Sequence, residues 1–212
     1  MRQTASFIHR INIFGWRYNK MGTIFNSGKP QTIENILASK DERVKFQSAV
    51  LQNNKQSTLI DMKMNIPGPI KNNDQLERLF DYGMQKFINQ FQVFDSQYEV
   101  VKQWNRESGN EVFILSQLSG SAVKKNAINF EDNFNIGRLF DVDVLTSSRK
   151  QSLSRSLFGY TPRKCFICDH PAKECARSRK HSVTELQSAI SNLYDKIFRN
   201  EENSNRLINC HS

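Results

Sequence analysis

The sequence lacks long hydrophobic runs, has few cysteines and contains none of the short motifs that mark several large enzyme classes. No run approaches the roughly 18 apolar residues of a membrane-spanning helix, so we do not expect an integral membrane protein. The four cysteines, three of them between positions 165 and 175, do not form the pattern of a secreted disulfide scaffold and favour a reducing, cytoplasmic location. A glycine-rich Walker loop, a G-x-S-x-G elbow and an H-E-x-x-H helix are all absent.

What the sequence does contain is enough material for one soluble globular domain. The chain has 212 residues, of which 38% are hydrophobic and 24% charged, a length and a balance that can bury a core. We expect this domain to span 32–198. Residues 1–31 are predicted to be a disordered extension, with Met21 as an alternative natural start, and 199–212 a frayed tail.

The net charge of +9 is concentrated in two stretches. Residues 1–20 carry four basic side chains and no acidic one, and residues 149–181, here called the basic segment, carry nine basic against two acidic side chains. A positive block of this kind favours a polyanionic ligand held by arginines. The same charge leaves nucleic acid as a competing partner.

Capping signals and hydrophobic periodicity predict an α+β fold. The predicted helices cover 33–53, as one helix or two short ones, then 74–91, 121–132 and 182–197, and the predicted strands cover 58–66, 98–104, 111–115 and 137–144. The helix starts are assigned to Thr32 and to capping boxes at Ser39 with Glu42, Asp74 with Glu77, and Ser182 with Glu185. We expect a single mixed or antiparallel sheet flanked by helices, with the cysteine-containing segment and the terminal helix packed near the site.

The strand predicted at 137–144 carries two aspartates, Asp141 and Asp143, within an apolar run. Because strand side chains alternate with period two, both carboxylates point to the same face and form a small anionic pocket. Mg²⁺ bound to a phosphorylated substrate would offset their repulsion. The alternative is that both are solvated charges on an edge strand.

A second constellation lies in the basic segment, where Cys165 and Cys168 form a C-x-x-C pair and are followed by Cys175 and His181. The C-x-x-C spacing suits a tetrahedral metal, and the other two side chains would complete a Cys₃His zinc site. His170 is a less favoured substitute for His181. The alternative is three reduced cysteines packed in a small basic module.

Several collinear segments resemble one family, the apo-citrate lyase phosphoribosyl-dephospho-CoA transferases. They are Ser39-Lys40-Asp41-Glu42-Arg43, Asn65-Ile66-Pro67-Gly68-Pro69-Ile70-Lys71, the run from Gly137 to Thr146, Leu153-Ser154-Arg155, the run from Pro162 to Cys168, and the run from Glu174 to His181. The resemblance covers about 33–197. It implies that 32–198 is a transferase domain, with the basic segment inside it.

The resemblance implies a nucleotidyltransferase that matures citrate lyase. Such an enzyme takes 2′-(5″-phosphoribosyl)-3′-dephospho-CoA from its 5″-triphosphoribosyl precursor, attaches it to a serine of the acyl carrier (gamma) subunit and releases pyrophosphate. Asp141 and Asp143 would be the catalytic carboxylates and would hold Mg²⁺, with Glu131 as a candidate third carboxylate. By analogy with other D-x-D nucleotidyltransferases, the centre of the sheet would resemble a polymerase-β-type palm.

Basic side chains are the candidates for contacts with the substrate phosphates, because a guanidinium matches the geometry of a phosphate. They are Arg138 and Arg155 in first place, then Arg163, Arg177 and Arg179, with Lys71 beside the Pro-Gly-Pro corner and Arg43 on the first helix. The positive charge would also favour docking of an acidic carrier domain. Neither a membrane nor a nucleic acid is an expected partner under this interpretation.

The chain departs from the family pattern just before the aspartate strand. Many members carry His-Pro there, whereas this chain has Phe134 and Asn135, so a role of that histidine cannot be transferred. Two other function classes remain open. A zinc-containing nucleic-acid-binding protein would explain the positive charge and the cysteines, and a non-catalytic partner of the lyase complex would keep the surface without needing the carboxylates.

Overall fold

The fold is described from a computed structural model, which covers residues 23–149 and 151–209. Met21 and most of the predicted extension 1–31 lie outside the described residues. Within the described part of that extension, Ile24 is only 4% exposed, and its backbone N–H donates to Ser191 Oγ at 3.2 Å. Residues close to Ile24 therefore contact the C-terminal helix, although the sequence predicted the extension to run to residue 31.

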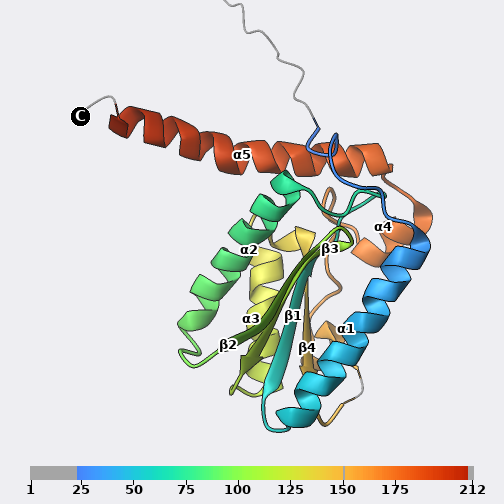
Figure 1. Cartoon of the computed structure of the whole chain (residues 1–212), viewed down its shortest axis with the longest axis vertical. Coiled ribbons are helices and arrows are strands. Elements are labelled where there is room, and N and C mark those ends of the chain that lie inside the picture. Colours follow the sequence, from blue (N-terminus) through green and yellow to red (C-terminus); the bar gives the residue numbers. More distant parts are fainter. Residues whose placement is uncertain (1–22, 150, 210–212) are drawn as a thin grey trace, which may run out of the picture.

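Four strands form one antiparallel sheet, which confirms the predicted α+β fold (Figure 1). The strands are β1 (Thr58–Met64), β2 (Glu99–Arg106), β3 (Gly109–Ser116) and β4 (Phe140–Thr146). Their spatial order is β2-β3-β1-β4, and every neighbouring pair is antiparallel. The aspartate strand β4 is therefore an edge strand that pairs with β1 on one side only.

Helices cover both faces of the sheet (Figure 1). They are α1 (Ile33–Asn53), α2 (Asp74–Gln92), α3 (Gly120–Asn133), the short α4 (Ala172–Ser178), and α5 (Val183–Asn209), with two 3₁₀ turns, η1 (Gly137–Leu139) and η2 (Arg155–Phe158). Helix α5 extends into the segment 199–212 that was predicted to fray, and lies across one end of the sheet. No helix in the described part of the chain is long and apolar enough to cross a membrane.

The period-two alternation of the strands divides the core into two clusters. The larger one packs α2, α3 and α5 against side chains such as Ile60, Met62 and Val142. The smaller one lies on the opposite face, where Leu51 of α1 packs with Leu59 and other apolar side chains of the sheet. Because Asp141 and Asp143 alternate with buried valines, they lie on the α1 face of the sheet.

The helix starts show where capping signals were correct and where they were wrong. Thr32 caps α1, and Ser182 and Glu185 form the predicted capping box, with Glu185 N–H donating to Ser182 Oγ at 3.1 Å. The prediction at Ser39 is wrong, because Ser39 lies inside the continuous helix α1 and hydrogen bonds with Ser108. The cap of α2 is Asn73, whose side chain accepts from Leu76 N–H, so Asp74 is the first helical residue instead of the cap.

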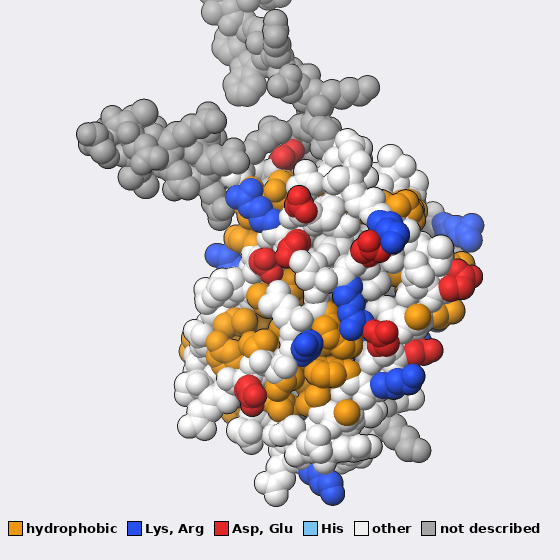
Figure 2. All heavy atoms as spheres, viewed as in Figure 1, with side chains coloured by type: hydrophobic (Ala, Val, Ile, Leu, Met, Phe, Trp, Pro, Cys, Tyr) orange, Lys and Arg blue, Asp and Glu red, His pale blue; other side chains and the backbone are white. Residues whose placement is uncertain are grey.

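The outer surface in Figure 2 carries charged side chains of both signs, together with hydrophobic side chains that gather over its lower part. Neither sign dominates this view. Among the described residues visible there, no continuous basic surface of the kind that tracks a nucleic-acid backbone is present.

Two glycines are required where β4 enters the core. A Cβ on Gly137 would lie 2.0 Å from the backbone oxygen of Phe130, so only glycine permits α3 and η1 to approach this closely. A Cβ on Gly83 of α2 would lie 2.2 Å from Cζ of Phe140, the first residue of β4. The ring of Phe140 thus occupies the space that the missing side chain leaves open.

We expect Gly83→Ala to destabilise the protein by about 1–3 kcal/mol, because the added methyl group must displace the buried Phe140 ring. Urea unfolding at equilibrium would measure the change. The matched control is Gln85→Ala, at an exposed position of the same helix, which we expect to change stability by less than about 0.5 kcal/mol. Equal stability of Gly83→Ala and the unaltered protein would contradict this packing.

Candidate active site

The pairing of β4 with β1 brings four charged side chains onto one face of the sheet. Asp143 lies opposite Asp61, and Asp141 lies opposite Lys63. The side chains of Asp141 and Asp143 are 43% and 34% exposed, whereas the side chain of Asp61 is fully buried. Three carboxylates therefore share a small area, two of them open to solvent and one closed off.

The ammonium group of Lys63 is the cation at the centre of these carboxylates. Its Nζ lies 2.8 Å from an oxygen of Asp143, 3.5 Å from one of Asp141 and 3.8 Å from one of Asp61. Burial alone would lower the pKa of Lys63, but the three negative charges outweigh it and hold the pKa above its ordinary value. Lys63 is therefore charged, and it offsets the repulsion among the three carboxylates.

Asp61 is held from the side of α1. Its Oδ2 accepts a hydrogen bond from Gln47 Nε2 at 2.6 Å and lies 3.7 Å from Arg43 Nε, while Arg43 also donates to the nearly buried Glu111. Burial raises the pKa of Asp61 well above its ordinary value; Glu111 adds to this effect, and Lys63 and Arg43 oppose it. The other oxygen, Oδ1, has no hydrogen-bond partner among the described residues.

A cavity of about 410 Å³ opens in front of Asp141 and Asp143. Burial raises the pKa of Asp143, but Lys63, a hydrogen bond from Ser152 and the charge of Lys124 together lower it below the ordinary value. Lys124 is itself buried, and its Nζ donates to the backbone oxygen of Val142 at 3.0 Å. The cavity thus combines carboxylates with nearby cations.

Of the arginines predicted to contact phosphate, Arg163 lies closest to the aspartates. Its Nη1 donates to the backbone oxygen of Phe140 at 2.6 Å and lies 3.6 Å from Asp141 Oδ1. Its side chain is 20% exposed and lines the cavity. Arg163 is therefore anchored to the edge of β4 while part of its guanidinium faces the open space.

Arg155 also lines this cavity, but its guanidinium is engaged with carboxylates of α3. Its Nη1 lies 2.9 and 2.8 Å from the two oxygens of Asp132, and its Nη2 donates to Glu131. The other oxygen of Glu131 accepts from Val142 N–H at 2.9 Å. Glu131 is thus committed to Arg155 and to the backbone, and Asp61 is the carboxylate that the sheet pairs with Asp143.

The remaining predicted phosphate ligands are divided between a second cavity and positions outside both. Arg138 and Arg179 line a second cavity of about 430 Å³, which shares Arg163 with the first. Three others line neither of these two cavities. Arg43 forms an ion pair with Asp61, and Lys71 Nζ donates to the backbone oxygen of Ile66 at 2.6 Å. Arg177 is exposed on α4. The predicted phosphate ligands therefore do not all lie at one site.

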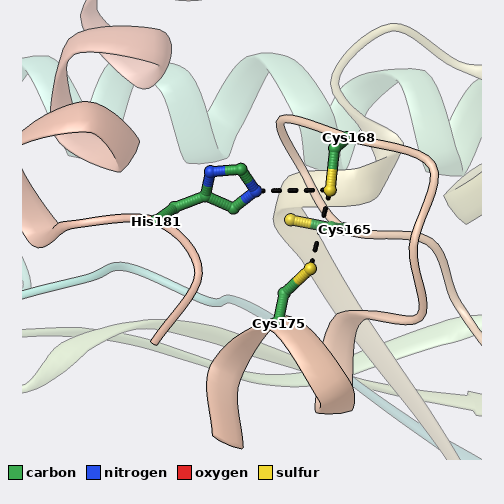
Figure 3. Close-up of side chains that lie close together, drawn as sticks. All are labelled: Cys165, Cys168, Cys175 and His181. Atoms are coloured by element: carbon green, nitrogen blue, oxygen red, sulfur yellow. Dashed lines mark hydrogen bonds between the residues drawn. The ribbon is translucent and has the colours of Figure 1, made fainter. Parts of the chain in front are cut away.

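The four predicted zinc ligands do come together. The donor atoms of Cys165, Cys168, Cys175 and His181 all lie within 4.8 Å of one another (Figure 3). His170 Nδ1 lies 3.8 Å from Cys168 Sγ and belongs to the same neighbourhood, but not to this group of four. The cluster borders the second cavity, which Cys165, Cys175 and His181 also line.

Sequence reasoning missed several residues of the site, above all Asp61, Lys63, Lys124 and Ser152. A signal for the first two was present, because Asp61 and Lys63 sit two apart in the apolar strand β1, the same period-two pattern that identified the aspartates of β4. No local pattern indicated Lys124 or Ser152, since each reaches the cavity only through the tertiary fold.

Half-buried carboxylates beside arginine and lysine side chains form the kind of site used by transferases that act on phosphorylated substrates. The family model described as apo-citrate lyase phosphoribosyl-dephospho-CoA transferase matches residues 31–197. The chain therefore belongs to the apo-citrate lyase phosphoribosyl-dephospho-CoA transferase family, and the resemblance noted in the sequence is confirmed.

Individual relatives agree with the family match. A protein of Streptococcus pyogenes serotype M3, named "Probable apo-citrate lyase phosphoribosyl-dephospho-CoA transferase", is 34% identical over 180 residues, which cover 84% of this chain and 93% of that protein. The apo-citrate lyase phosphoribosyl-dephospho-CoA transferase of Citrobacter koseri is 30% identical, covering 73% and 84% of the two chains. The Escherichia coli O7:K1 protein of the same name is 30% identical, covering 78% and 90%.

We expect Lys63→Met to destabilise the protein by about 3 kcal/mol or more, because it leaves the buried Asp61 and two further carboxylates without their central cation. Adding Asp61→Asn to Lys63→Met should recover part of this loss, since one of the repelling charges is then removed. Urea unfolding of the single and double variants would measure both effects.

The matched control is Lys102→Met at an exposed position of β2, for which a change below about 0.5 kcal/mol is expected. A Lys63→Met protein as stable as this control would show that the carboxylates do not depend on Lys63. Failure of the second substitution to restore any stability would show that Asp61 is not one of the repelling charges.

Proposed function

We propose that this chain is a nucleotidyltransferase that attaches 2′-(5″-phosphoribosyl)-3′-dephospho-CoA to a serine of the acyl carrier (gamma) subunit of citrate lyase. The donor is the 5″-triphosphoribosyl precursor. The serine oxygen forms a bond to the α-phosphorus, the bond from that phosphorus to the bridging oxygen breaks, and pyrophosphate leaves with the electron pair. The serine proton passes to a carboxylate of the aspartate pair.

The observation that carries this proposal is the placement of Asp141 and Asp143 on the free edge of the sheet. Both are part-exposed to a cavity of about 410 Å³ and lie within 3.5 Å of the Lys63 ammonium group, in a chain whose relatives are named as transferases. The reaction gathers negative charge on the phosphoryl oxygens and on pyrophosphate. A site of fixed cations beside ionised carboxylates matches this need.

The donor set also fits Mg²⁺, which prefers carboxylate oxygens and completes its octahedral shell with water and substrate phosphates. Asp141 and Asp143 would hold the ion, and the neighbouring Asp61, which lies opposite Asp143 across the sheet, has a buried Oδ1 without a partner among the described residues. When bound, Mg²⁺ would supply positive charge against the triphosphate. The Lys63 ammonium group lies within 3.5 Å of both aspartates and is one of the groups that lower the pKa of Asp143.

The two cavities suggest where the different parts of a substrate as large as the precursor bind. The cavity beside the carboxylates takes the phosphates, with Arg163 as their nearest anchored guanidinium. The adjoining cavity of about 430 Å³ includes apolar side chains such as Leu139, Phe166 and Leu186, and suits the dephospho-CoA portion. Arg163 lines both cavities and therefore lies at the junction between the charged and the apolar parts of the substrate.

The carrier subunit would approach the part-exposed edge of β4 at the cavity mouth. The net positive charge of the basic segment complements an acidic carrier subunit. This attraction would speed the association of the carrier with the enzyme. Within this proposal the described residues from 32 to 198 act as one transferase domain in the cytoplasm. An assay of carrier modification separates this function from nucleic-acid binding and from a non-catalytic role in the lyase complex.

We expect Asp141→Asn and Asp143→Asn, alone and combined in a double variant, each to lower the rate of carrier modification at least about 100-fold, because each removes a negative charge that would hold the metal against the phosphates. Purified protein, apo-carrier, Mg²⁺ and the precursor are combined, and intact-mass spectrometry follows the mass gain of the carrier. The control Asp41→Asn changes an exposed aspartate of α1 and should leave the rate unaltered. No mass gain with the unaltered protein, or full activity of the double variant, would reject the mechanism.

We expect Arg163→Lys to lower kcat/KM for the precursor by about ten- to hundredfold, since one charge-assisted hydrogen bond to the substrate contributes about 1.5–3 kcal/mol and an ammonium group cannot reproduce the fork. The same mass assay at varied precursor concentrations gives the constant. Arg106→Lys on β2 is the control, because its guanidinium stacks on Trp104 away from both cavities. A kcat/KM for Arg163→Lys close to that of the control variant would show that Arg163 has only a structural role.

A further inference from the structure

The cysteine cluster lies outside the carboxylate cavity, and the proposed reaction does not use it. Its four side chains come from three places in the chain: Cys165 and Cys168 from a loop, Cys175 from α4, and His181 from the link into α5 (Figure 3). Cys168 Sγ lies 3.5 Å from Cys175 Sγ and 3.2 Å from His181 Nε2. The side chains of the cluster point toward one common centre.

These separations suit a tetrahedral zinc ion. With Zn–S bonds of about 2.3 Å and Zn–N bonds of about 2.0–2.1 Å, the ligand atoms of a tetrahedral site lie roughly 3.5–3.8 Å apart. The distances in the cluster are close to this range, and all four donors fall within 4.8 Å of one another before any ion draws them in. Three sulfurs and one nitrogen fill the coordination shell, which is the composition of a structural site.

The loop around the first two cysteines already has the backbone arrangement of a metal-binding turn. Cys165 N–H donates to the backbone oxygen of His170 at 2.8 Å, which closes the turn. On the other side of this contact, Lys164 and Pro171 pair as an isolated antiparallel bridge, so the backbone holds together the two ends of the loop that carries Cys165 and Cys168.

The segment that contains the cluster has almost no hydrophobic core of its own. Between residues 159 and 182, the only buried residues are Cys165 and Cys175, and the one helix is the seven-residue α4. A short segment of this kind cannot bury enough apolar surface to offset the conformational entropy lost on ordering. A metal ion supplies the missing stabilisation, since binding to ordered ligands becomes folding free energy.

We propose that Cys165, Cys168, Cys175 and His181 bind one structural zinc ion, and that this ion orders residues 159–182 against the edge of β4. The ordered segment places Arg163, whose backbone oxygen accepts from Ala172 N–H at 2.8 Å while its guanidinium contacts Phe140 and Asp141. It also forms the wall of the second cavity through Cys165, Cys175 and His181. This inference does not depend on the proposed transfer reaction.

The first test is metal content. After loading with zinc in reducing buffer and desalting, elemental analysis by mass spectrometry should find one zinc ion per chain, and Co²⁺ in its place should give the absorption bands of thiolate coordination. Cys168→Ser and His181→Ala should weaken zinc binding by more than about tenfold, since even the loss of a supporting residue around a metal costs that much. The control His170→Ala removes the neighbouring imidazole and should keep the zinc.

Each other result overturns the inference. If the unaltered protein contains no zinc, the proposed site does not exist. If Cys168→Ser retains zinc, the ion is bound elsewhere. Zinc lost in His170→Ala but kept in His181→Ala rejects His181 as the fourth ligand. A disulfide between Cys168 and Cys175 in the protein purified under reducing conditions, seen by intact mass as the loss of two hydrogens, shows a redox pair in place of a metal site.

The second test measures how well residues 159–182 are ordered, and it does not require enzymatic activity. The segment offers trypsin Arg163, Lys164, Lys173, Arg177, Arg179 and Lys180. Removing zinc with a chelator should raise the rate of cleavage at these sites at least about tenfold, while cleavage sites in α1 and α2 keep their rates. Uniformly faster cleavage along the chain, or no change at the segment, would show that zinc does not act by ordering residues 159–182.

Discussion

The ion group around Lys63 is the interaction on which the rest of the site depends. Antiparallel pairing of β1 with β4 and the period of two force Asp61, Asp141 and Asp143 onto one face of the sheet, where they repel one another. The Lys63 ammonium group lies within 4 Å of all three carboxylates and is held charged by them. Without this cation, the arrangement that exposes two aspartates to the cavity would destabilise the centre of the sheet.

The free edge of β4 explains why charged side chains gather where they do. An edge strand has unpaired backbone groups, and in β4 these groups are satisfied by the site itself. Val142 N–H donates to Glu131, the backbone oxygen of Val142 accepts from Lys124, and that of Phe140 accepts from Arg163. The same contacts that protect the edge from pairing with another chain therefore bring a carboxylate and two cations to the sides of the aspartates.

Local patterns were sufficient to predict the strands to within a few residues, two of the four assigned helix starts and the direction of the two aspartates, because alternation and capping act over a few residues. The predicted strand 137–144 begins only at Phe140, because Gly137–Leu139 form the turn η1. They were not sufficient to identify Lys63, which contacts Asp143 from 80 positions away and is placed only by the order of strands in the sheet. The role of Arg155 was equally hidden, since its donors are committed to Asp132 and Glu131 of another helix. The cysteine cluster was predictable from spacing because a C-x-x-C turn is itself local.

The basic segment shows why a run of like charges in a sequence does not define one binding site. In the structure its arginines have different surroundings. Arg155 is bound by carboxylates of α3, Arg163 by the backbone of β4, and Arg177 is exposed on α4. Arg163 connects the cysteine-containing segment with the carboxylate site, because its backbone lies in that segment and its guanidinium lies beside Asp141. A change that loosens that segment therefore also loosens a contact at the edge of the sheet that carries the carboxylates.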